Sequence, residues 1–162
     1  MGMSTEIDRP YSGGFVGDAH HFALRVYIED TDFGGVVYHA NYLRYLERAR
    51  SDMLRAAGID QRGAVERGEG VYAVSEVQIR YRRPARLDDE LVIVSRLEEV
   101  RGACCVIAQQ VLRGDELFAE ARVTAVFISP AGRPKRQPAE WVEKFERIRG
   151  SAAQHDKRQA PG

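Results

Sequence analysis

The sequence predicts an α+β fold in which one long helix packs on an antiparallel sheet of about five strands. Two observations lead to this prediction. A helical pattern of about five turns follows an initial strand, and four strand-like runs then follow one another with no helical pattern between them. Strands joined by short turns pair antiparallel, so the four runs form a meander.

The first two elements are a strand at residues 21–28 and the long helix. Apolar side chains recur at three- and four-residue steps and therefore share one buried stripe. Gly58 follows where a left-handed C-terminal cap is usual. The expected helix starts near residues 38–41 and is roughly 28 Å long. The stripe consists of Tyr42, Tyr45, Leu46, Ala49, Met53 and Ala56.

The remaining elements follow a Gly- and charge-rich connection at residues 60–70. Apolar and polar residues alternate from Val77 to Tyr81, and Pro84 ends the ladder. A short C-terminal helix is expected at 138–149, where a proline precedes apolar residues at helical spacing. The other strands are expected at 91–97, 103–112 and 117–128. We expect a flexible leader at 1–18, a single domain at 19–149 and a flexible tail at 150–162.

Composition excludes several classes of function. Lys plus Arg equals Asp plus Glu at 24 each, so the chain lacks the basic field that drives nucleic-acid binding. No apolar run approaches the roughly 18 residues needed to span a bilayer, and residues 1–20 lack the apolar core of a secretion signal, so we expect a cytoplasmic protein.

Cys104 and Cys105 are adjacent, a poor geometry for a disulfide. The four histidines show no metal-ligand spacing, so no metal is expected.

The most informative segment places Asp32, a Gly34-Gly35 turn and His39 directly before the long helix. A helix start carries unpaired N–H groups and the positive end of the dipole, which suit a developing oxyanion. The two glycines let the chain fold back, so that Asp32 can face the same point. The arrangement predicts an active site with Asp32 and His39 as its catalytic candidates.

Two blocks of sequence carry a resemblance to a known family. DTDFGGVVYHANYLRYLERAR at residues 30–50 and IRYRRPARLDDEL at residues 79–91 resemble the YbgC (tol-pal-associated) branch of the 4-hydroxybenzoyl-CoA thioesterase family. The resemblance extends over roughly residues 21–128. It implies a hot-dog fold, in which the long helix lies across a curved antiparallel sheet, two subunits join their sheets, and acyl-CoA enters at the subunit interface. By position, Asp32 matches the family's catalytic carboxylate and His39 the histidine at the helix start.

The expected reaction is therefore hydrolysis of an acyl-CoA thioester. Asp32 either activates water or attacks to form a mixed anhydride, and N–H groups near His39 polarise the carbonyl. No cofactor is expected, since coenzyme A arrives with the substrate. Contacts with the substrate are expected from Gly35, Val36, Tyr38, Arg82 and Arg83. The two arginines suit CoA phosphates, although a solvated strand face explains them equally well. Packing against the sheet is the alternative for Tyr38.

Several alternatives remain open on sequence alone. The chain could be an acyl-CoA-binding partner protein of the cell-envelope or lipid-synthesis machinery with little turnover, or a hot-dog dehydratase. We expect a homodimer at least, and the resemblance implies a tetramer as a further possibility. Asp30 is expected to shape the turn by accepting backbone hydrogen bonds, and Asn41 to cap the helix.

Overall fold

The computed structural model describes the backbone of residues 5–159 and the side chains of residues 5–151. Three α-helices and six strands occur in this part of the chain, together with 3-10 turns at Glu6–Asp8 and Ile28–Asp30. The strands are β1 (Gly14–Val16), β2 (Ala19–Arg25), β3 (Val71–Tyr81), β4 (Glu90–Val100), β5 (Cys104–Arg113) and β6 (Glu116–Ile128). The helices are α1 (Asn41–Ala56), α2 (Gln61–Glu66) and α3 (Ala139–Gln159). None of these helices is both long and apolar enough to cross a membrane.

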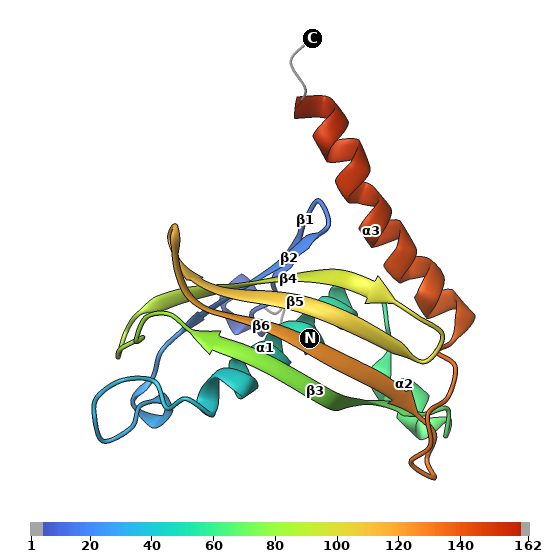
Figure 1. Cartoon of the computed structure of the whole chain (residues 1–162), viewed down its shortest axis with the longest axis horizontal. Coiled ribbons are helices and arrows are strands. Elements are labelled where there is room, and N and C mark those ends of the chain that lie inside the picture. The colour runs from blue at the N-terminus through green and yellow to red at the C-terminus, as the bar shows by residue number, and fades with distance from the viewer. Residues whose placement is uncertain (1–4, 160–162) are drawn as a thin grey trace.

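The strands form one antiparallel sheet in the order β1-β2-β4-β5-β6-β3. Figure 1 shows α1 lying across one face of this sheet and α3 extending away from it. The expected α+β class and the four-strand meander are confirmed. The sheet has one strand more than expected, because β1 pairs with β2 through a tight turn. β1 is three residues long and flanked by glycines, too short for an alternating pattern to reveal it.

The helix α1 is a little shorter than expected, at 16 residues, and ends as its sequence predicts. Gly58 has a φ of +79°, and the N–H groups of Gly58 and Ile59 donate to the carbonyls of Arg55 and Leu54. This pair of bonds is a Schellman cap, in which glycine avoids the strain of a left-handed residue.

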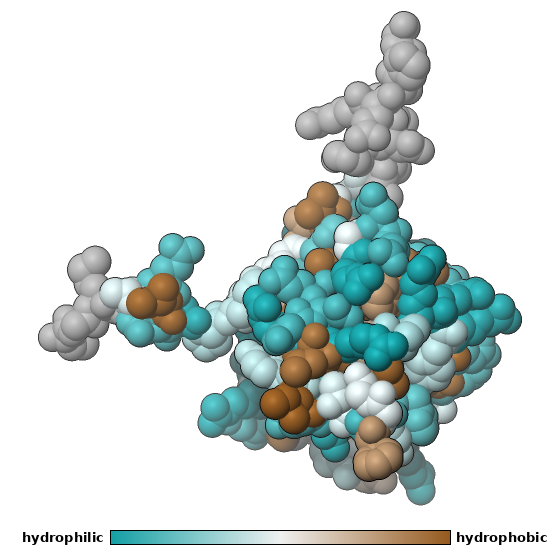
Figure 2. Space-filling model, turned by 90° about the vertical axis from the view of Figure 1, so that its left-hand side faces the viewer, coloured by the Kyte–Doolittle hydropathy of each residue, from teal (hydrophilic) through white to brown (hydrophobic). Residues whose placement is uncertain are grey.

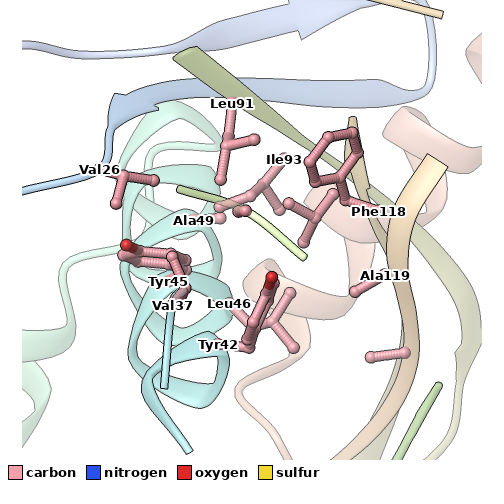
Figure 3. Close-up of a cluster of buried hydrophobic side chains, with 13 residues drawn as sticks. Val26, Val37, Tyr42, Tyr45, Leu46, Ala49, Leu91, Ile93, Phe118 and Ala119 are labelled. Carbon is pink, nitrogen blue, oxygen red and sulfur yellow. The ribbon is translucent and has the colours of Figure 1, made fainter. Parts of the chain in front are cut away.

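The apolar stripe of α1 packs on the sheet in two buried clusters. The first lies under the N-terminal half of α1 (Figure 3), where Tyr45, Leu46 and Ala49 meet Leu91 and Ile93 of β4. The second lies under the C-terminal half and includes residues from α2 and α3. Together the clusters fix both ends of α1 on the sheet, which holds the segment before α1 in place.

Three segments differ from the sequence predictions. β1 lies within residues 1–18, which we expected to be a flexible leader. The expected connection at 60–70 contains α2, whose N-cap Asp60 accepts a hydrogen bond from the N–H of Gly63. α3 runs to Gln159, through most of the expected tail. Residues 1–4 and 160–162 of the expected leader and tail lie outside the described residues, and the domain boundaries stay a prediction.

A buried His-Asp pair ties the β1–β2 hairpin to α1. His20 Nε2 lies 2.8 Å from Asp52 Oδ2, which also accepts the N–H of Gly13. Both side chains are buried, and His20 Nδ1 has no hydrogen-bond partner among the described residues. Burial lowers the pKa of His20 below its usual 6.5 and outweighs the opposing effect of Asp52.

This pair predicts that the protein loses stability in mild acid. The folded protein binds a proton on His20 less readily than the unfolded chain does, so His20 contributes fully above the unfolded pKa of 6.5. That contribution falls as the pH drops below this value. The measurement is the urea midpoint at neutral pH and at about pH 5.5. The urea midpoint of His20→Asn should fall less on acidification than that of wild type. The urea midpoint of His21→Asn should fall as much as that of wild type. Equal losses in all three proteins would contradict the assignment.

Candidate active site

Asp32 lies in a tight turn that the two glycines make possible. The N–H of Asp32 donates to the carbonyl of Val36 (2.8 Å), and the N–H of Gly35 donates to the carbonyl of Asp32 (3.0 Å). Gly35 has a φ of +78°, a conformation that L-residues with side chains rarely adopt. The N–H of Gly34 donates to Asp32 Oδ1 at 2.8 Å, and a Cβ on Gly34 would lie only 3.2 Å from the same oxygen. The turn therefore orients the carboxylate while leaving the side chain exposed.

A second set of hydrogen bonds holds the start of α1. Ala40 is the N-cap and supplies no side-chain acceptor. The prediction that Asn41 caps the helix is therefore wrong, because its Nδ2 donates instead to Asp30 Oδ1 at 3.0 Å. Asp30 is buried and also accepts the N–H of Tyr27, as expected for a residue that shapes the turn. The result is an α1 N-terminus without a capping side chain. The N–H groups of Asn41 and Leu43 donate to the carbonyls of Tyr38 and Ala40, so within the first turn the N–H of Tyr42 is the one left for a ligand.

Asp32 and His39 line one open cavity of about 330 Å³. Of the predicted substrate-binding residues, Val36, Arg82 and Arg83 line it as well, whereas Gly35 and Tyr38 do not. The Tyr38 ring lies against the imidazole of His39, with ring centroids 4.6 Å apart. The full lining is Asp32, Val36, Val37, His39, Tyr42, Tyr81, Arg82, Arg83 and Pro84.

Tyr81 and Tyr42 belong to this site although the sequence analysis did not assign them to it. The Tyr81 hydroxyl donates to the carbonyl of His39 at 2.8 Å and so ties β3 to the start of α1. Burial raises the pKa of both phenols above the usual value. Tyr81 and His39 are 42 residues apart in sequence, and no local pattern connects them.

Arg82 and Arg83 lie on the rim of the cavity and form exposed ion pairs with β6. Arg82 Nη2 lies 2.6 Å from Glu120 Oε1, and Arg83 Nη1 lies 3.4 Å from Glu116 Oε2. Exposed pairs of this kind contribute at most about 1 kcal/mol, so a phosphate group can compete for either guanidinium. No group of three or more His, Cys, Asp or Glu side chains within the described residues is placed to hold a metal ion.

The surface around the Asp32 turn is partly apolar. Ile28, Phe33 and Leu87 are exposed, with the side chain of Phe33 at the tip of the turn. Figure 2, which looks at the end of the molecule where this turn lies, shows hydrophobic patches set among hydrophilic surface. A mixed surface of this kind suits a substrate with both apolar and charged parts.

Comparisons with known proteins find a matching family model, relatives by sequence and similar solved structures. A family model of the thioesterase-like superfamily matches residues 26–147. The chain is 38% identical over 125 residues to the acyl-CoA thioester hydrolase YbgC of Escherichia coli O6:H1, covering 76% of this chain and 92% of that protein. It is 37% identical over 123 residues to the acyl-CoA thioesterase YbgC of Haemophilus influenzae, covering 73% and 90%. A probable thioesterase from Bartonella henselae has a similar structure, with a TM-score of 0.71, 38% identity, and coverage of 74% of this chain and 99% of that chain.

Proposed function

The chain belongs to the thioesterase-like superfamily, and we propose that it hydrolyses the thioester of an acyl-CoA to the free acid and CoA, with Asp32 as general base or nucleophile. Its fold is the hot-dog fold that the resemblance implies. The observation that supports the assignment of Asp32 is its position beside His39 in one open cavity at the uncapped start of α1.

Stabilisation of the oxyanion comes from the start of α1. As the thioester carbon becomes tetrahedral, its oxygen gains negative charge. N–H groups near His39 and the positive end of the helix dipole are fixed in advance and favour that charge. Because Tyr81 and Asp30 hold the loop on both sides of His39, these donors need no reorganisation during the reaction.

Asp32 can act by either of two routes. As a base, its carboxylate takes a proton from water as the water oxygen attacks the carbonyl carbon. The C–S bond then breaks, and the proton passes to the departing thiolate. As a nucleophile, Asp32 attacks the carbon itself, CoA leaves as the thiolate, and water hydrolyses the mixed anhydride. A burst of CoA release equal to the enzyme concentration would identify the second route.

Arg82 and Arg83 are proposed to bind the phosphates of CoA. They lie on the rim of the same cavity, and a guanidinium matches phosphate geometry with two parallel hydrogen bonds. Their ion pairs with Glu120 and Glu116 are exposed and weak, so a phosphate can replace either carboxylate.

The functional unit is proposed to be a homodimer joined through β3. This strand has 11 residues and lies at one edge of the sheet (Figure 1), whereas β1 at the other edge has three. A long edge strand leaves a row of unpaired backbone groups, which a second copy can satisfy by antiparallel pairing. Further assembly into a tetramer, cytoplasmic residence, and protein partners in the cell envelope or lipid synthesis stay predictions.

His39→Ala separates the contribution of the His39 imidazole from that of the His39 backbone. The variant keeps the backbone and its bond to Tyr81, so affinity for an inert acyl-CoA analogue should change little. Turnover should fall about tenfold to a hundredfold if the imidazole orients Asp32 or water. The measurements are kcat with a preferred thioester and analogue affinity, with His21→Ala as a control outside the cavity. Unchanged kcat would make the imidazole a packing residue, and lost affinity with intact kcat would assign it to binding.

A panel of short, long and aromatic acyl-CoAs, followed by release of free thiol, tests the activity itself. Tight binding of acyl-CoA without thiol release would favour the alternative, an acyl-CoA-binding partner protein.

A further inference from the structure

A buried pair of side chains, Asp30 and Asn41, lies at the two ends of the loop that carries the candidate catalytic groups. Asp30 is the last residue of the 3-10 turn after β2, and Asn41 is the first residue of α1. Asp32 and His39 lie between them in sequence. Asn41 Nδ2 donates to Asp30 Oδ1 at 3.0 Å, and only 5% of Asp30 and 9% of Asn41 are exposed. We refer to Asp30, Asn41 and the hydrogen bond between them as the clasp.

Asp30 also fastens the loop at two further points. Its carbonyl accepts the N–H of Tyr38 at 2.9 Å, and its second carboxylate oxygen accepts the N–H of Tyr27 at 2.9 Å. One residue therefore joins the segment that follows β2, the backbone next to His39 and the start of α1. A hydrogen bond in an interior of low dielectric is stronger than one in water, so a buried clasp resists opening.

Asn41 serves the clasp instead of capping α1. Asn is a favoured capping residue, but Asn41 occupies the first helical position, and Ala40 at the N-cap supplies no side-chain acceptor. A side-chain cap would fix the helix start by occupying N–H groups of the first turn. The clasp fixes it through a bond between two side chains, which uses none of the backbone N–H groups of α1.

We propose that Asp30 and Asn41 are positioning residues for thioester hydrolysis, because their hydrogen bond fixes the place of the Asp32 carboxylate relative to the start of α1. This inference rests on the proposed function. Both residues act through the loop, since neither is among the described residues that line the Asp32 cavity. A misplacement of about 1 Å at a reacting centre can lower a rate by about a hundredfold. Opening the clasp should therefore lower kcat, whereas substrate affinity, which many contacts share, should change little.

Exchange of the two side chains tests the proposal. Asp30→Asn has one acceptor oxygen for two N–H groups, and Asn41→Asp sets a carboxylate against a carboxylate, so each single variant loses the bond of the clasp. In the double variant Asp30→Asn/Asn41→Asp, the new amide can donate to the new carboxylate and still accept the N–H of Tyr27. Each single variant should lower kcat by about tenfold or more with KM within about twofold of wild type, and the double variant should recover kcat to within about threefold of wild type.

Asp52→Ala is the control, at the other end of α1. Like Asp30, Asp52 is buried and pairs with one backbone N–H, that of Gly13 at 2.9 Å, and one side-chain nitrogen, His20 Nε2 at 2.8 Å. Because the control loses both contacts, its urea midpoint should fall at least as far as those of the single clasp variants, while its kcat stays near wild type. A kcat loss in folded Asp52→Ala as large as that in the clasp variants would reduce the clasp to a contribution to stability and overturn the inference.

Hydrogen exchange at the Tyr38 N–H gives a reading that needs no turnover, because this group donates to the carbonyl of Asp30. Exchange should be faster in each single variant than in wild type, and should return to the wild-type rate in the double variant. If Asp30→Asn does not fold, Asn41→Ala removes the donor of the clasp and takes its place in the comparison.

Failure of the proposed function is distinguishable from failure of this inference. Wild-type protein that releases no thiol from acyl-CoA would contradict the proposed function, and exchange at Tyr38 would then decide on the clasp, with unchanged exchange in the single variants overturning it. Where wild type does release thiol, folded single variants with wild-type kcat, or a double variant with kcat no higher than that of the single variants, would overturn the inference.

Discussion

Asp32→Asn is expected to lower kcat by at least about a hundredfold while the fold and acyl-CoA affinity stay close to wild type. The amide has almost the same shape as the carboxylate, and its oxygen can still accept the hydrogen bond of the Gly34 N–H. It cannot take a proton from water or attack a thioester. The measurement is kcat by free thiol release, beside the urea midpoint and calorimetric affinity.

The control for this variant is Asp18→Asn, an equal change in the β1–β2 turn, outside the Asp32 cavity. It should keep turnover near wild type. Near-normal turnover in folded Asp32→Asn protein would reject Asp32 as base or nucleophile, whatever the control shows.

Val74→Lys is expected to separate the subunits and to lower turnover by at least about a hundredfold. Val74 is half exposed on the edge strand β3 and would be buried by pairing. The change places a charge on each side of the interface, where an unpaired buried charge is strongly unfavourable. Because the proposed functional unit is the dimer, activity should fall together with the mass.

Light scattering and kcat at micromolar concentration measure both effects. Wild type should have the mass of a dimer or tetramer. Val16→Lys makes the same change on β1, at the opposite edge of the sheet, and should alter neither mass nor activity. A folded, fully active wild-type monomer would reject the interface through β3.

Much of the fold could be predicted because its main elements carry strong local patterns. The stripe from Tyr42 to Met53, the alternation from Val77 to Tyr81 and the strand-like runs of β4–β6 extend over enough residues to be read from the sequence. Gly58 marks the end of α1. The missed elements are those with weak local patterns. β1 has three residues and is held by its pairing with β2, and α2 contains a helix-weakening glycine, Gly63.

The candidate site also contains residues that the sequence predicts and residues that it does not. Asp32, Val36 and His39 are close in sequence, and their shared cavity follows from one turn and one helix start. Tyr81 comes from a distant strand and contacts only the backbone of His39, so nothing in its neighbourhood predicts the contact. The sequence predicts a capping role for Asn41, whereas the structure shows a bond to Asp30. An asparagine at the start of a helix suits either role, so the sequence does not separate them.

The most direct measurement of the central claim is product formation from acyl-CoA by the wild-type protein. Free thiol and free acid, quantified together over a series from butyryl- to palmitoyl-CoA, should appear in equal amounts. Their rate should be at least about a hundredfold above that of the Asp32→Asn protein. Thiol release no faster than that of Asp32→Asn, for every member of the series, would contradict the account.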